Sequence, residues 1–393
     1  MRTLTQLDEW PRHQTLDTFD VVASDSEKWS DGSWICVGDP SGRCHLITAL
    51  RFYPNTNVVD GYAIVTLDDG RQYNLRVSRR LRPAHDDLSC GPLWMDIVQG
   101  LRTIRFGALP NDSGIEFDLQ WDGASPCFDE TPGVRRYQDG RIVRARSNYT
   151  QVGHVNGTIT VHGRRFEVGP SWVGARDHSW GIGDTGTGNV PSAAAPPADV
   201  TDYAGAQVRD FGLRQFCFVR FPGRTLTYRF HAGVDGTMSH VNSCVDYPYG
   251  SGREAWSYAR LALDDVTFVD GLPRVATSRV SFTRPDGGVE RFEIRNVSGP
   301  VYMQGGGYWD GFTDGRGRGA YRGESVVEHD VWDVSHPTVV RDAAGEVVPQ
   351  RNGAWAETIA IWTNLDDPSE VGIGEFEAVV GGPYPGVTEQ EDA

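Results

Sequence analysis

Apolar and polar residues alternate with a period of two along much of the chain, which predicts strands. The clearest example is the segment 114–121, where the alternation is unbroken and predicts a strand with one wet face. The segments 63–67 and 72–77 flank Asp69 and Gly70. Because Asp-Gly favours the tight turns that join antiparallel strands, these segments are predicted to form a hairpin.

The same pattern continues through the second half of the chain. Segments 215–221 and 226–231 are predicted strands joined by a Pro-Gly turn, and further strands are expected between 260 and 297. Earlier in the chain, 151–161 is expected to form a hairpin that turns near Gly157. Helical periodicity is scarce and the strands are short and evenly spaced. The chain is therefore predicted to be all-β, with two antiparallel barrels or sandwiches.

One segment interrupts this pattern. Residues 183–205 are rich in Gly, Pro and Ala, a composition that cannot form regular structure of any length. The segment is predicted to link an N-terminal β-domain, 1–182, to a C-terminal β-domain, 206–393.

Composition narrows the possible functions. The 393 residues carry a formal net charge of −16, and this negative field disfavours binding to nucleic acid or to anionic lipid. No stretch approaches the roughly 20 apolar residues of a membrane span, and the first residues lack the pattern of a signal peptide. The protein is expected to be soluble and cytoplasmic.

Cysteine and histidine spacing indicates no metal or cofactor. The six cysteines include no Cys-x-x-Cys pair, so free buried thiols are expected instead of zinc ligands or disulfides. His329 and His336 lie near carboxylates, but their spacing matches no familiar ligand motif. Neither a metal nor a cofactor is predicted.

Candidate chemistry concentrates in residues 169–181. This stretch places Trp172, Arg176, Asp177, His178 and Trp180 between glycines. Rigid indoles beside a carboxyl group and a titratable ring suit the wall of a reactive cavity. The structural alternative is that Arg176 and Asp177 stabilise a turn while the tryptophans fill the core.

A second polar cluster lies at 326–333. The segment is predicted to be a strand with Glu328 and Asp330 on one face and His329 on the other, because side chains alternate across a strand. These carboxyl groups are further candidates for acid or base chemistry.

The motif residues resemble a known superfamily. Tyr149-x-Gln151-x-Gly153, followed by Gly157 and by the segment 176–181, is similar to the pattern of the AttH-like and carotenoid 1,2-hydratase superfamily. In that superfamily an Asp-x-x-Trp-Gly element closes the first of two lipocalin-like domains. Asp177 stands at the position of the motif aspartate.

The later Glu328-His329-x-x-Trp332 is similar to a segment of the second domain in that superfamily. The resemblance implies two consecutive lipocalin-like β-domains with an apolar ligand pocket near their junction. Members of the superfamily include hydratases of isoprenoid or prenylated phenolic substrates and enzymes of intramolecular cycloaddition.

The first functional hypothesis is a hydro-lyase, cofactor-free, that acts on an apolar isoprenoid-, polyketide- or steroid-like small molecule. Protonation of carbon needs an acid, and placement of water needs a basic group. Asp177 is the first candidate for the acid, and His178 is the candidate for proton transfer or water positioning. Glu328 and Asp330 are the alternative carboxyl groups.

The substrate is expected to be bound mainly by aromatic side chains. Trp172, Trp180, Trp309 and Trp332 are predicted to line one shared cavity, and Arg176 and His329 are further binding candidates. Two alternatives remain open: a cyclase that works by holding its substrate in a reactive shape, and a non-catalytic carrier of an apolar ligand.

Overall fold

The structure is a computed structural model of the whole chain. It describes the following residues: 4–9, 11, 13, 16–130, 134–138, 140–183, 212–269, 272–309, 311–336, 339–350, 355–380, 384–385 and 387.

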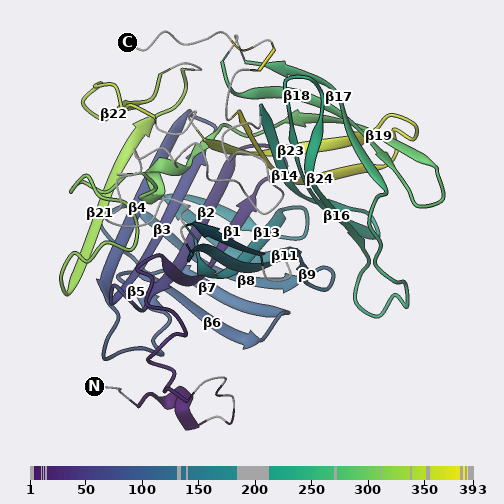
Figure 1. The fold of residues 1–393 in the computed structure, drawn as a ribbon. Coiled ribbons are helices and arrows are strands. Elements are labelled where there is room, and N and C mark those ends of the chain that lie inside the picture. Colours follow the sequence, from purple (N-terminus) through teal and green to yellow (C-terminus); the bar gives the residue numbers. More distant parts are fainter. Residues whose placement is uncertain are drawn as a thin grey trace.

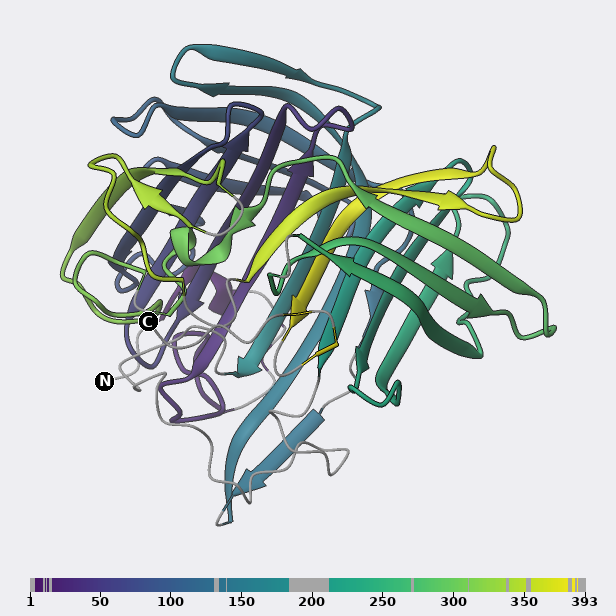
Figure 2. The same ribbon diagram turned by 90° about the horizontal axis from the view of Figure 1, so that it is seen from above.

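Two antiparallel sheets make up the described residues. The first has 15 strands and the second has nine. In Figure 1 the first sheet, largely purple to blue, lies to the left of the second, which is green and yellow. Seen from above, both sheets are strongly curved and lie against each other (Figure 2). The first forms a half-barrel and the second a nearly closed barrel.

The main path of the first sheet follows the order β22-β21-β4-β3-β2-β1-β13-β11-β8-β7-β6-β5. Its strands are β1 (Trp29–Gly38), β2 (Cys44–Tyr53), β3 (Val58–Leu67), β4 (Arg71–Arg80), β5 (Ser89–Cys90), β6 (Leu93–Gln99), β7 (Thr103–Ala108), β8 (Ile115–Gly123), β9 (Phe128–Asp129), β10 (Val134–Gln138), β11 (Arg141–Val161), β12 (Arg164–Val168), β13 (Val173–Ile182), β21 (Ser325–Asp333) and β22 (Arg341–Asp342).

The second sheet follows the order β16-β15-β14-β24-β23-β19-β18-β17. Its strands are β14 (Leu213–Phe221), β15 (Arg224–Ala232), β16 (Met238–Asp246), β17 (Arg260–Phe268), β18 (Val275–Thr283), β19 (Val289–Asn296), β20 (Val301–Tyr302), β23 (Ala356–Asn364) and β24 (Val371–Val380). Two short 3-10 turns, η1 (Gln6–Glu9) and η2 (Met303–Gly306), complete the elements.

The predicted all-β fold with two antiparallel units is confirmed. β3 and β4 form the hairpin predicted from Asp69 and Gly70, and β8 covers the alternating segment 114–121. The structure describes no α-helix in its described ranges. None of the helical segments there has the length and apolar character needed to cross a bilayer.

The boundary between the two units is not described. Of the predicted linker 183–205, only Gly183 is among the described residues, so the division at this segment stays a prediction. The strand pairing also shows that the two halves of the chain share one sheet. β21 pairs with β4 along its whole length, so a strand from the second half of the chain extends the first sheet at its outer edge (Figure 1).

The expected hairpin turn at Gly157 is wrong. β11 runs unbroken from Arg141 to Val161, and Gly157 lies inside it with φ 136°. A Cβ at this position would approach the Asp118 carbonyl oxygen to 2.1 Å. Gly157 therefore allows close contact with the neighbouring strand β8, and the chain turns at His162 and Gly163 instead.

Three apolar clusters hold the fold together. One fills the concave side of the first sheet and includes Leu46 and Trp121. Another fills the second barrel and includes Phe282 and Trp362. The third lies between the sheets and joins Ala175 of the first to Ile359 of the second, among other residues. Since apolar contacts cover both of its faces, β3 is buried at every position.

Candidate functional site

The sheet face between the two units carries a polar site beside the third apolar cluster. On β13, Val173 and Ala175 belong to that cluster, and Asp177 follows on the same face because strand side chains alternate. The cross-strand neighbours of Asp177 are Trp34 on β1 and Thr150 on β11. β13 lies against β24 and β14 of the second sheet. Asp177 therefore faces the second sheet.

The second sheet presents three buried glutamates to this face. Glu357 on β23 stands directly opposite Glu377 on β24. Glu375 lies on the same face as Glu377, two residues earlier on β24, and is 0% exposed. Carboxylates that face each other across strands repel when both are ionised. This arrangement therefore favours protonation of part of the group.

Arginines neutralise only some of these carboxyl groups. Arg214 contacts Glu377, and Arg229 contacts Glu130, a fourth buried glutamate, contributed by the first half of the chain. Asp177, Glu357 and Glu375 have no ion pair among the described residues.

Burial raises the pKa values of the glutamates. The pKa of Glu375 and that of Glu357 lie well above the ordinary range, chiefly because burial disfavours the ionised form and then because neighbouring carboxylates repel it. Asp177 is close enough to add to this repulsion at Glu357 and Glu377. The raised pKa values favour the neutral acid form of these groups, which can donate a proton.

Several polar atoms at this site have no partner. Both carboxyl oxygens of Glu375, Oδ1 of Asp177 and Nε1 of Trp34 are buried and make no hydrogen bond within the described part of the chain. Buried polar groups are nearly always hydrogen-bonded, so these atoms are suited to contact a polar group of a ligand or water.

Aromatic side chains surround the carboxyl groups. Trp34 stacks on Phe218 with ring centroids 5.8 Å apart. Trp355 lies 5.4 Å from Trp309, and the Arg214 guanidinium sits 4.7 Å from the Trp355 ring. Such faces favour positive charge and apolar ligand atoms.

The candidate residues of the stretch 169–181 lie on both faces of β13. Arg176, His178 and Trp180 lie on the face opposite Asp177, because their positions alternate with it. His178 bonds to Asp31 through Nε2 at 2.8 Å, and Trp180 is 39% exposed. The structure therefore does not bring His178 and Asp177 into one catalytic pair.

Glu328 and Asp330 lie far from Asp177 on the same sheet. β21 and β13 are separated by four strands, which is roughly 24 Å measured along the sheet at about 4.8 Å per strand spacing. Both carboxylates face the buried Arg76, with Asp330 Oδ2 2.9 Å from its Nη2. Their contacts indicate a structural ion cluster. His329 is exposed on the other face of β21.

The four tryptophans predicted to share a cavity are separated. Trp172 belongs to the core of the first sheet, Trp332 to a small cluster with Tyr302, and Trp180 to an exposed face. Only Trp309 packs against the cluster between the sheets. The expectation of one cavity lined by all four is wrong, because these side chains pack against different apolar clusters or face solvent. Trp34 and Trp355 lie beside the carboxyl groups instead.

Sequence reasoning missed the glutamates. Glu375 and Glu377 flank Phe376, and this alternation predicts a strand with one wet face. The only available signal was the number of carboxyl groups in a strand otherwise rich in apolar residues. No group of three or more His, Cys, Asp or Glu side chains in the described ranges is arranged to hold a metal ion.

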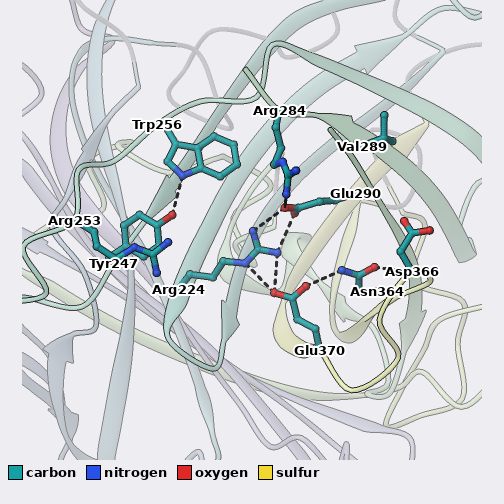
Figure 3. A pocket seen from close by; sticks show the side chains of 10 residues that line it. All are labelled: Arg224, Tyr247, Arg253, Trp256, Arg284, Val289, Glu290, Asn364, Asp366 and Glu370. Atoms are coloured by element: carbon teal, nitrogen blue, oxygen red, sulfur yellow. Dashed lines mark hydrogen bonds and ion pairs between the residues drawn. The ribbon is translucent and has the colours of Figure 1, made fainter. Parts of the chain in front are cut away.

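A separate pocket of about 450 Å³ opens at one end of the second barrel. Figure 3 shows Arg224 bonded to both Glu290 and Glu370 in this pocket. Arg224 bridges Glu290 at 2.9 Å and Glu370 at 2.8 Å, and Asn364 donates to Glu370 at 2.7 Å. Because these charges satisfy one another, the network is suited to closing the barrel end.

Glu375→Gln is expected to make stability less dependent on pH. The raised pKa means that folded Glu375 keeps a proton that the unfolded chain releases above about pH 4.5. Wild-type stability should therefore fall as pH rises above this value, by up to about 1.4 kcal/mol per pH unit. The variant lacks this loss, so its free energy of unfolding relative to wild type should be higher at pH 7 than at pH 4.5. Urea unfolding at both pH values measures the effect.

The matched control is Glu293→Gln, which alters a partly exposed glutamate that pairs with Arg279. Its stability relative to wild type should be nearly the same at both pH values. An equal pH response of the two variants would show that Glu375 is ionised in the folded protein.

Comparison with solved structures identifies the fold. A crystal structure of a candidate AttH protein from Nitrosomonas europaea aligns with a TM-score of 0.52 at 10% identity, over 90% of this chain and 93% of that chain. Kievitone hydratase from Nectria haematococca aligns with a TM-score of 0.43 at 11% identity, over 92% and 93%. CghA gives 0.47 at 11%, over 91% and 90%. The likeness to the candidate AttH protein shows a shared fold.

The sequence comparisons place the chain in a family. No curated protein matches it. The model of the family of unknown function DUF8625 matches residues 4–386, which is nearly the whole chain. The protein therefore belongs to the DUF8625 family.

Proposed function

We propose that the protein is a cofactor-free hydro-lyase that adds water to, or removes it from, an apolar isoprenoid-, polyketide- or steroid-like molecule bound between the two sheets. The observation that carries this proposal is the group of buried glutamates facing Asp177, whose pKa values are raised by burial and mutual repulsion. A carboxylic acid that stays neutral at neutral pH can act as a general acid.

Glu357 is the proposed acid. Glu377 is engaged with Arg214, whereas Glu357 has no arginine contact in the described ranges and is influenced electrostatically by Asp177. In hydration, the Glu357 proton passes to one alkene carbon and leaves the adjacent carbon positively charged. The faces of Trp34 and Trp355 would stabilise that charge.

Asp177 is the proposed base. Its buried Oδ1 is free to accept a hydrogen bond, so it can hold a water molecule against the cation. The water oxygen bonds to carbon and its proton passes to Asp177. Transfer of a proton from Asp177 back to Glu357 through solvent restores the site. Dehydration follows the same steps in reverse.

A second candidate function is a shape-driven cyclase. The closely spaced rings of Trp309, Trp355 and Tyr308, with centroids 5.3–6.2 Å apart, offer a rigid wall that could hold a folded substrate. A cyclisation of this kind depends on orientation and needs no proton donor.

The test begins with mass spectrometry of apolar molecules extracted from the purified protein. Compounds of the class found, together with isoprenoid alkenes and prenylated phenols, are then incubated with the protein in heavy-oxygen-labelled water. A hydro-lyase should place the label in the product at the former double bond. Product with an unchanged elemental composition and a new ring would overturn hydration and favour the cyclase.

A further inference from the structure

The face of β13 opposite Asp177 holds a buried positive charge without a counter-ion. Arg176 is 4% exposed, and its Nε and Nη2 donate to Gln151 Oε1 at 3.0 and 2.7 Å. No carboxylate in the described part of the chain lies within ion-pair distance of it. A buried charge that lacks an opposite charge is costly, so Arg176 is suited to an anionic partner from outside the chain.

Gln151 fixes the position of Arg176. The Gln151 Nε2 donates to the carbonyl oxygens of Leu101 and Ser125 at 3.0 and 2.8 Å, so its Oε1 must face Arg176. Gly123 makes room for this arrangement, because a Cβ there would lie 2.2 Å from the Gln151 Nε2. The guanidinium is thus held along one edge by neutral groups.

Among the described residues, the titratable groups closest to Arg176 supply no negative charge. The Cys127 thiol lies beside Arg176, and burial raises its pKa although Arg176 lowers it. Burial also raises the pKa of Tyr149 and that of Tyr249. All three stay neutral at neutral pH, so the positive charge of Arg176 is not compensated.

A row of rings leads from solvent to Arg176. The guanidinium lies 5.7 Å from the centre of the Tyr149 ring. Tyr149 stacks on His178 at 5.3 Å with 11° between the ring planes, and Trp180 lies 5.9 Å beyond His178. Flat rings in this arrangement favour a flat apolar ligand body.

We propose that this face of β13 is a second binding site, which takes a flat aromatic or conjugated monocarboxylate. The carboxylate pairs with Arg176, and the body lies along Tyr149, His178 and Trp180. A carboxylate matches the planar donor pattern of a guanidinium. Asp31, hydrogen-bonded to His178, disfavours anions with more than one charge at the entrance.

Calorimetric titration of the full chain tests the site with benzoate, cinnamate and naphthoate, each compared with its neutral primary amide. At least one carboxylate should bind with one-to-one stoichiometry and about tenfold or more tighter than its amide. Equal affinity of each acid and its amide, or no binding by any acid, would overturn the proposal. The measurement needs no turnover, so its outcome is independent of the hydro-lyase proposal.

Cys127 offers a matched pair of variants that keep Arg176 in place. Cys127→Asp puts a carboxylate beside the guanidinium and should weaken carboxylate binding about tenfold or more. Cys127→Asn has the same shape without the charge and should bind as wild type does. Asp177→Asn, on the other face of β13, should also leave binding unchanged. Equal binding by the two Cys127 variants would show that Arg176 does not hold the carboxylate.

Discussion

Asp177→Asn is expected to lower turnover by about 10²–10⁴ without lowering the free energy of unfolding. The variant keeps the shape of the side chain but cannot accept a proton from water. Asp177 makes no ion pair among the described residues, and its charge opposes ionisation of Glu357 and Glu377. Removal of that charge relieves this repulsion but also removes the attraction between Asp177 and Arg146, so stability should change little.

The measurements are the rate of label incorporation and urea unfolding of the same samples. Asp118→Asn is a suitable control, because Asp118 is exposed and its ion-pair partner among the described residues is Arg105 on the neighbouring strand β7. Neither quantity should change. A loss of about 1–3 kcal/mol in stability at full activity would instead identify Asp177 as a structural residue.

Local patterns predicted the strands because their causes are local. Asp69 and Gly70 determine a turn within four residues, and alternation in 114–121 reflects one covered face. The prediction of a turn at Gly157 was wrong because it also rested on a local signal. Asn-Gly is a turn signal, but here the glycine is needed because β8 approaches the backbone closely, and that contact joins residues about 40 positions apart in the sequence.

The candidate site was only partly predictable, since it depends on contacts between the sheets. Asp177 was found through its motif. Glu375 and Glu377 alternate with Phe376 as they would on a solvent-exposed face. That face is buried only because the first sheet packs against it. Glu328 was assigned to the site because it lies in a similar polar-aromatic segment, but β21 places it at the far edge of the sheet.

Glu357→Gln is expected to lower turnover at neutral pH by about 10²–10⁴, because the amide cannot supply the proton that the buried carboxyl group donates to carbon. The sign of the pH dependence follows from the raised pKa. Wild-type activity should fall as pH rises through that pKa, since the proton donor is lost, and the residual activity of the variant should lack this fall.

A double variant that carries Glu357→Gln and Asp177→Asn tests whether the two residues act in one step. If Glu357 and Asp177 act in one reaction, the double variant should be little slower than the slower single variant, because groups that act as a unit are strongly non-additive. Multiplicative losses would show that the residues act independently. Glu293→Gln is again the control variant, and its turnover should equal that of wild type. Full activity of a folded Glu357→Gln protein would remove the proton donor from the mechanism and leave the shape-driven cyclase, in which the aromatic wall around Trp355 does the positioning.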